Sequence, residues 1–115
     1  MTGNTTAKDI VLSYIQALDS LNYNEAKSYL NDKIKIFGPA GEQFSSPTDF
    51  INMLQNFKGK YDIKKVFTDS GEVCVLYDLI TESVVAFMSS WYQLENDKIV
   101  SIKTIFDSKL FPLTN

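Results

Sequence analysis

The 115 residues are enough for one domain with its own hydrophobic core, and 44% apolar against 22% charged residues indicate a globular chain. The formal net charge is −3 and all eleven basic residues are lysines, scattered along the chain, so a nucleic-acid partner is not expected. Histidine and arginine are absent, which excludes a Ser-His-Asp or Cys-His relay, histidine-bound zinc and bidentate recognition of a phosphate by arginine.

The first stretch of the chain predicts two helices in succession. Thr6 with Asp9 resembles a capping box, because the threonine oxygen can accept from early helix amides and the carboxylate suits the positive helix end. Apolar residues at helical spacing then predict an amphipathic helix over about residues 7 to 20. Asn22 with Glu25 repeats the capping pattern and predicts a short second helix. The apolar residues of the two helices are Ile10, Tyr14, Ala17, Leu18 and Leu21, then Ala26, Tyr29 and Leu30.

The middle of the chain predicts a strand, a turn and a third helix. Residues 33–36 alternate polar and apolar, as a half-buried strand does, and the Gly-Pro-Ala-Gly sequence at 38–41 indicates a turn. Ser46, Pro47 and Asp49 place a cap residue, a first-turn proline and an acid in the order that favours a helix start. The apolar residues of this helix, and the glycine expected to stop it, are Phe50, Met53, Leu54, Phe57 and Gly59.

From residue 60 onward the apolar period changes to two, which predicts four consecutive strands. Turn residues at 69–71, 82–83 and 96–97 separate them. Helices first and a strand meander afterwards favour an α+β fold, with a curved antiparallel sheet whose one face the helices cover.

The closing hairpin, residues 84–107, has no fully polar face. If Met88, Ser90 and Tyr92 face the helices, alternation turns the neighbouring residues outward. An exposed apolar surface of this kind usually marks an interface. We therefore expect a homodimer packed sheet against sheet, the alternative being a monomer whose helices or C-terminal tail cover the surface. The residues expected at the dimer interface are Leu76, Val85, Phe87, Ser89 and Trp91.

The single cysteine, Cys74, has no second thiol for a disulfide or a metal site, so no metal and no cofactor is expected. The first nine residues lack the basic and apolar regions of a signal peptide, and no apolar run approaches the ~20 residues of a membrane helix. We therefore expect no membrane partner and, by default, a cytoplasmic location. Catalysis, if any, must use carboxylates, tyrosines, lysines or water.

The order of several segments resembles the SnoaL-like branch of the nuclear-transport-factor-2-like (NTF2-like) superfamily, over about residues 6 to 107. These segments are SYIQALDSLNYNEAKSYL, KIKIFGPAGE, SSPTDFINML, VCVLYD and SSWYQLENDKIVSIKTIFD. The resemblance implies one domain over residues 1–115, with 1–5 and 109–115 as flexible or capping tails. It also implies a cone, in which a strongly bent sheet wraps around three helices and encloses a pocket, and dimerisation is common in the family.

The resemblance also implies roles for particular positions. Tyr14 matches the helix tyrosine that donates to the developing oxyanion in ketosteroid isomerase. The catalytic base of that enzyme falls on or beside Phe37, and its protonated aspartic acid falls near Ser90, so neither position carries a carboxyl group here. We do not expect isomerisation by that arrangement.

The resemblance and strand alternation together give a candidate pocket, whose predicted lining is Tyr14, Phe37, Met53, Tyr77, Met88, Ser90, Tyr92, Ile102, Thr104 and Phe106. Tyr14 is the candidate catalytic donor, with a purely structural role as the alternative. Asp78 and Asp107 are the candidate acids, although alternation turns both out of the pocket, and Asp107 has the alternative of orienting the rim.

Two functions follow from these patterns. The first is binding of a small apolar or aromatic molecule in the cone, with possible weak chemistry of the cyclase, isomerase or hydratase type. The second is a non-catalytic homodimeric protein-interaction module, favoured by the missing acid-base set and the apolar outer face. The sequence does not name the ligand.

Overall fold

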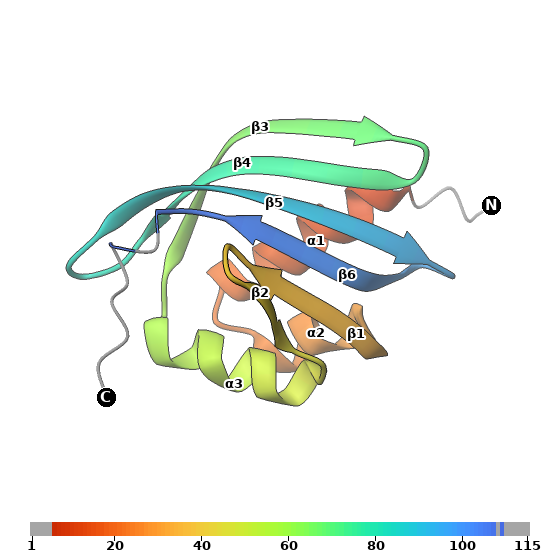
Figure 1. The fold of residues 1–115 in the computed structure, drawn as a ribbon, viewed down its shortest axis with the longest axis horizontal. Coiled ribbons are helices and arrows are strands. Elements are labelled where there is room, and N and C mark those ends of the chain that lie inside the picture. The colour runs from red at the N-terminus through yellow and green to blue at the C-terminus, as the bar shows by residue number, and fades with distance from the viewer. Residues whose placement is uncertain (1–5, 108, 110–115) are drawn as a thin grey trace.

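The computed structural model describes residues 6–107 and 109, and Figure 1 shows the arrangement of its helices and strands. The expected tails, 1–5 and 109–115, lie outside the described residues apart from Lys109. The helices are α1 (Ala7–Asp19), α2 (Tyr23–Ser28) and α3 (Pro47–Phe57). The strands are β1 (Leu30–Gly38), β2 (Gly41–Phe44), β3 (Lys60–Asp69), β4 (Glu72–Ile80), β5 (Val85–Glu95) and β6 (Lys98–Ile105).

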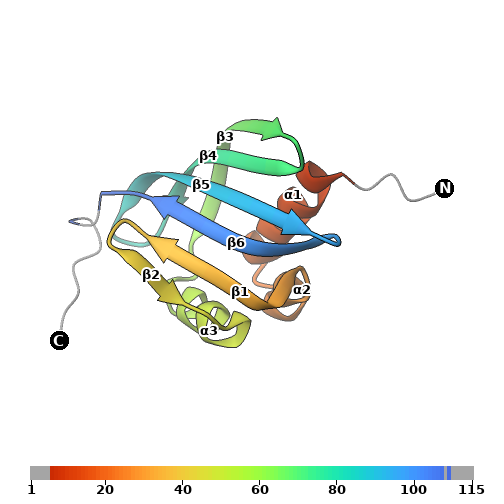
Figure 2. The same ribbon diagram turned by 45° about the vertical axis from the view of Figure 1, so that its right-hand side comes forward.

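The six strands form one curved sheet in the order β2-β1-β6-β5-β4-β3. Figures 1 and 2 show α1 behind β5 and β6, and α3 beside β1 and β2, so the helices share one face of the sheet. The predicted α+β class, with a curved sheet around three helices, is confirmed. One pair differs from the expected antiparallel pattern, because β1 runs parallel to β6. A parallel pair needs a long connection, and the chain from β2 to β5 supplies it.

Side-chain caps fix where all three helices begin, and at α2 the predicted cap Asn22 accepts through Oδ1 from the amide of Glu25 at 3.3 Å. Thr6 Oγ1 accepts from the amide of Asp9 at 3.2 Å and Asp9 Oδ2 accepts from the amide of Thr6 at 3.2 Å, which is the predicted capping box. Ser46 Oγ accepts from the amide of Asp49 at 3.3 Å at the start of α3. That helix ends at Phe57, because Lys58 takes a left-handed conformation with φ of 50°.

Several local expectations differ from the structure. Leu21, expected on the apolar stripe of the first helix, lies beyond the end of α1 and is 46% exposed. Lys58, rather than the expected Gly59, ends α3. The second helix was predicted to carry Tyr29 and Leu30, but it ends at Ser28 and Leu30 opens β1 opposite Ile99. The carbonyl of Tyr29 accepts from the amide of Ile99 at 2.9 Å, so pairing with the sheet replaces a further helical turn. Strand β2 was not predicted, because its four residues are too few to show an alternating sequence pattern.

The core lies between the inner face of the sheet and the helices. On β4 and β5 buried and more exposed residues alternate, which gives each strand one face toward the helices and one toward solvent. The apolar stripe of α1 supplies the facing side chains, including Val11, Tyr14 and Leu18. Within the described residues, no helix is long and apolar enough to span a bilayer.

Candidate functional site

A cavity of about 480 Å³ opens between the inner face of the sheet, α1 and α3. Its volume lies within the range of known small-molecule pockets, ~300 to 1,000 Å³. The structure places all ten residues of the predicted lining at this cavity: Tyr14, Phe37, Met53, Tyr77, Met88, Ser90, Tyr92, Ile102, Thr104 and Phe106. These ten residues come from α1, α3, four strands and the segment just after β6, so the cavity depends on the whole fold rather than on one segment.

Sequence reasoning missed half of the lining. The missed residues are Leu18, Ile36, Gly38, Gln43, Phe44, Phe50, Leu54, Phe57, Tyr61 and Leu79. The apolar spacing of α3 had already placed Phe50, Leu54 and Phe57 on the same helix face as Met53. Only Met53, however, had been assigned to the pocket. Gln43 and Phe44 were missed because β2 was missed. The lining contains no lysine, aspartate or glutamate, so the cavity wall within the described residues is uncharged.

Three hydroxyl groups on adjacent strands form a hydrogen-bonded chain in the wall. The oxygens of Tyr77 and Ser90 are 2.9 Å apart, and those of Ser90 and Thr104 are also 2.9 Å apart. Strand register explains the chain, because Ser90 is the direct partner of Thr104 and lies next to the Tyr77–Met88 pair. Ser90 is the central member of this chain, because it bonds to both other hydroxyl groups. Its side chain is only 1% exposed, so these hydrogen bonds satisfy a buried hydroxyl.

Tyr14 reaches the cavity from α1 and is 1% exposed. Its ring meets that of Tyr92 edge to face, with centroids 6.1 Å apart. No residue in the described part of the chain hydrogen-bonds to its hydroxyl. Since every fully buried side-chain oxygen among these residues does have a partner, the hydroxyl of Tyr14 borders the open cavity.

Burial sets the protonation of the tyrosines around the cavity. Desolvation raises the pKa of Tyr77 to about 12, against a lowering contribution from its hydrogen bond with Ser90. Desolvation likewise raises the pKa of Tyr14 and Tyr92 well above the ordinary value and raises that of Tyr61, with the neighbouring tyrosines adding to each shift. These phenols are therefore neutral near pH 7 and act as hydrogen-bond donors rather than as bases.

Partly exposed residues border the cavity where it meets solvent, among them Phe44, Met53 and Phe106. Phe37 also borders the cavity, but Lys103 Nζ lies 5.3 Å from the centroid of its ring. Lys103 also lies 4.7 Å from the ring centroid of Trp91, a residue of the outer sheet face. Phe37 thus borders the cavity and also, through Lys103, contacts the outer face of the sheet.

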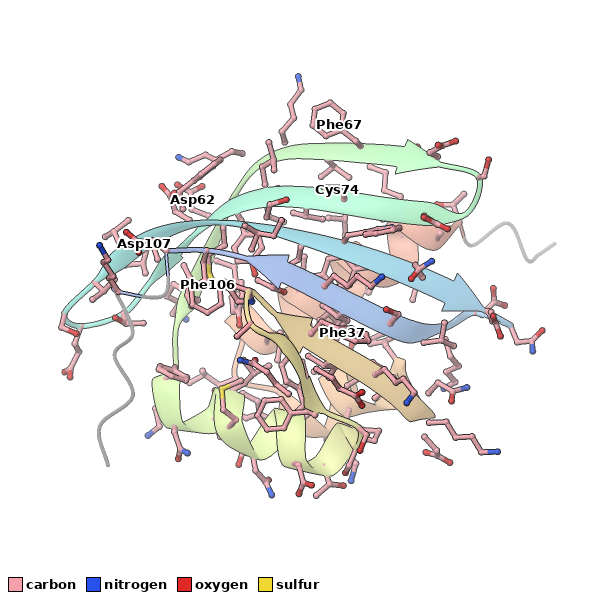
Figure 3. All side chains as sticks on the ribbon, in the orientation of Figure 1. Phe37, Asp62, Phe67, Cys74, Phe106 and Asp107 are labelled. Atoms are coloured by element: carbon pink, nitrogen blue, oxygen red, sulfur yellow. The ribbon has the colours of Figure 1, made fainter. Side chains whose placement is uncertain are left out.

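The two candidate acids lie away from the cavity lining. Asp78 is on the outer face of β4, with its carboxylate 3.8 Å from Lys64 Nζ. Asp107 is exposed beyond β6 and accepts from the amide of Lys109 at 3.0 Å (Figure 3). Within the described residues, no three His, Cys, Asp or Glu side chains gather as a metal site.

The outer face of the sheet carries large apolar side chains in solvent. We call Phe67, Val85, Phe87, Trp91 and Ile105 the outer patch; they are between 39% and 70% exposed. Leu76 and Ser89, the other residues expected at a dimer interface, are half-buried on the same face. The indole nitrogen of Trp91 donates to Glu72 at 2.8 Å, which holds its ring against the sheet.

No protein-family model and no curated protein matches the sequence. Among solved structures, the fold is similar to an NTF2-like protein of unknown function from Cytophaga hutchinsonii, with 31% identity and a TM-score of 0.86. That alignment covers 95% of this chain and 96% of the other.

Two more distant structures share the fold. A protein from Shewanella putrefaciens inferred to be a SnoaL-like polyketide cyclase is 12% identical, with a TM-score of 0.77 and coverage of 90% of this chain and 81% of the other. A protein from Kribbella flavida inferred to be a ketosteroid isomerase is 11% identical, with a TM-score of 0.82 and coverage of 95% and 83%.

Proposed function

This chain belongs to the NTF2-like superfamily, as its sequence resemblance predicted, and from this premise we propose that its cavity binds a small apolar or aromatic molecule. The observation that carries the proposal is the cavity of about 480 Å³ with an aromatic and aliphatic wall. Hydroxyl groups from Tyr14, Ser90 and Thr104 interrupt that wall and offer a few polar contacts. A mainly apolar wall with few polar groups is the usual composition of a small-molecule site.

Binding is ranked ahead of catalysis because the lining lacks an acid or base of ordinary strength. General acid-base catalysis near neutral pH needs a group that titrates there, and burial raises the pKa of all four tyrosines that line the cavity. Chemistry of the cyclase, isomerase or hydratase type would rest on Tyr14 as the donor to a developing oxyanion. If such turnover is found, Tyr14→Phe is expected to lower it by ~10² to 10³.

The binding proposal is tested with aminoanthracene, a neutral aromatic compound whose fluorescence rises in apolar surroundings. We expect saturable binding to the full chain. Met53 lines the cavity from α3, so Met53→Trp should fill part of the space and weaken binding at least about 10-fold. Gln55→Trp places the same side chain on the exposed side of α3 and is the matched control.

Two results would count against a cavity site. The first is an absence of saturable binding to the unmodified protein. The second is an equal loss of binding in the Met53→Trp and Gln55→Trp variants, which would place the probe elsewhere. Thermal unfolding of both variants shows whether each is folded when binding is measured.

A second function is favoured by the outer patch, namely self-association of the protein through the outer sheet face. Phe87 and Val85 are 59% and 62% exposed on neighbouring outward positions of β5, and Ile105 of β6 is 70% exposed. Contiguous exposed apolar surface of this kind usually marks an interaction site. A second copy of the chain would present the same surface, as a two-fold symmetric interface requires.

Sedimentation velocity tests the dimer, with an expected mass of twice 13.0 kDa for the unmodified chain. Phe87→Lys puts a charge in the centre of the patch and should shift the protein to monomer. Leu21→Lys is the matched control, because Leu21 is 46% exposed but lies after α1, outside the sheet. A monomer for the unmodified protein at micromolar concentration would remove this second function.

A further inference from the structure

The edge strand β2 contains a β-bulge, and Gln43 is its extra residue. In the β1–β2 register Phe37 pairs with Glu42. The preceding residue of β1, Ile36, pairs with Phe44, so Gln43 has no partner on β1. A regular strand turns successive side chains to opposite faces, but the bulge lets Gln43 and Phe44 both border the cavity. Bulges of this kind occur often beside functional sites, because they redirect a side chain.

Gly38 determines where the amide group of Gln43 lies. A Cβ atom placed on Gly38 would be 2.8 Å from each of Cδ, Nε2 and Oε1 of Gln43, so the amide lies flat over the glycine backbone. That distance is well inside van der Waals contact, and an alanine at this position would therefore push the amide away. The backbone of Gly38 is not in the left-handed region, so the alanine itself would fit without strain.

Both polar edges of this amide are open to a ligand. An amide that is covered on its flat side keeps its NH2 group and its oxygen in the plane for hydrogen bonds. Within the described part of the chain, no group hydrogen-bonds to Nε2 or Oε1 of Gln43. Gln43 is exposed and also borders the cavity, so its amide lies where the cavity meets solvent.

The amide of Gln43 offers a donor and an acceptor side by side. A carboxamide on a ligand presents the complementary pair and can make two parallel hydrogen bonds with it. An ester of the same size can only accept, and a hydrocarbon can do neither. The rest of the lining at this end is apolar, with Phe44 and Met53 beside the opening.

We infer that Gln43 is the specificity-determining residue at the mouth of the cavity, and that it selects an apolar ring compound ending in a carboxamide. The ring lies in the cavity and the carboxamide bonds to the amide of Gln43 at the opening. Gly38 is a positioning residue, because it acts through Gln43 and needs no contact with the ligand. This inference rests on the proposed function, since it specifies the ligand of the same cavity.

The test compares ligands that share one two-ring skeleton: naphthalene, the methyl ester of naphthoic acid, and naphthalene carboxamide. Dissociation constants come from NMR titration of the isotope-labelled full chain, which also follows the side-chain NH2 signal of Gln43. We expect the carboxamide to bind about 3- to 10-fold tighter than the ester, because the ester can make only one of the two hydrogen bonds. The NH2 signal of Gln43 should shift more with the carboxamide than with naphthalene.

Two variants connect the preference to the named groups. Gln43→Met keeps the length of the side chain but removes its donor and acceptor, so the carboxamide and ester affinities should come within about 2-fold of each other. Gln55→Met on the exposed side of α3 is the matched control and should keep the preference. Gly38→Ala should reduce the preference as Gln43→Met does, and the double variant should show no further loss, because both changes act on one amide. Thermal unfolding shows that each variant is folded.

The outcomes separate this inference from the proposal on which it rests. Equal affinity for the carboxamide and the ester in the unmodified protein overturns the inference and leaves cavity binding intact. A preference that survives in Gln43→Met also overturns it. A preference that is lost in Gln43→Met but kept in Gly38→Ala overturns the positioning role of Gly38. If none of the three ligands binds, cavity binding fails and this inference fails with it.

Discussion

Tyrosine side chains dominate the chemistry of the cavity because burial keeps their hydroxyl groups protonated. Tyr14 and Tyr92 pack edge to face, and the rings of Tyr61 and Tyr77 lie 5.6 Å apart. Each ring therefore removes water from the next, and the hydroxyl groups lose their hydration without meeting a positive charge. A neutral, donor-rich wall is the result.

Tyr77 gives this burial a measurable pH dependence. Its pKa is about 12 in the folded protein against 10.0 for the ordinary phenol, so the folded state holds the proton more tightly. The stabilisation is complete below pH ~10 and is lost as pH rises toward 12, by ~1.4 kcal/mol per pKa unit or ~3 kcal/mol in all. Urea unfolding at several pH values should show a smaller loss above pH ~10 in Tyr77→Phe than in the unmodified protein. Equal losses of unfolding free energy in the two proteins would show that the pKa of Tyr77 is not raised in the folded state.

Ser90 is the residue whose replacement tests the hydroxyl chain. Ser90→Ala removes both of its hydrogen bonds and deprives Tyr77 and Thr104 of a partner. We expect the free energy of unfolding to fall by ~1 to 3 kcal/mol, measured by urea denaturation. The control is Ser89→Ala, one position along the strand on the opposite face, which should cost less than ~0.5 kcal/mol. Equal effects at the two positions would mean that the buried chain adds no stability.

Among the elements, helix α3 forms one wall of the cavity and is capped at both of its ends. Its first turn is capped by Ser46 and contains Pro47, and Lys58 ends it in a left-handed conformation. Four of its residues border the cavity: Phe50, Met53, Leu54 and Phe57. The position of α3 therefore sets the width of the cavity.

The cap of α3 should be worth a measurable amount. Ser46→Ala removes the acceptor of the Asp49 amide and should lower the free energy of unfolding by ~0.5 to 2 kcal/mol. Ser45→Ala changes the preceding exposed residue and should stay within ~0.5 kcal/mol. Thermal or urea unfolding measures both. A Ser46→Ala variant as stable as Ser45→Ala would show that the proline and the packing of α3 hold the helix start without the cap.

For the whole molecule, the spacing of apolar residues in the sequence predicted helices and strands locally, but it did not predict which distant strands pair. Alternation along β5 placed Met88, Ser90 and Tyr92 on one face, and all three are buried against the helices. The parallel β1–β6 pair could not be predicted, because the two strands are far apart in the sequence and no turn links them. Leu30 was misassigned for the same reason, since its helical spacing yields to a sheet partner, Ile99, that lies far along the chain.

The candidate site was likewise predicted where it depends on local sequence patterns and missed where it depends on the assembled fold. Residues on strongly periodic strands could be assigned to an inner face from sequence, whereas Gln43 and Phe44 could not, because β2 is too short for a pattern. The hydrogen-bonded chain of Tyr77, Ser90 and Thr104 could not be predicted either. It depends on the register that brings Ser90 opposite Thr104, and register is a property of the assembled sheet.

The outer patch predicts that stability depends on protein concentration. If a second copy covers Phe87 and Trp91, unfolding is coupled to dissociation, so the midpoint temperature rises with concentration by mass action. Calorimetry over an about 100-fold range should show this rise for the unmodified chain and no rise for Phe87→Lys. Leu21→Lys should behave like the unmodified chain, because its lysine lies outside the sheet. A midpoint that stays constant for the unmodified chain would mean that the outer patch is exposed in a folded monomer.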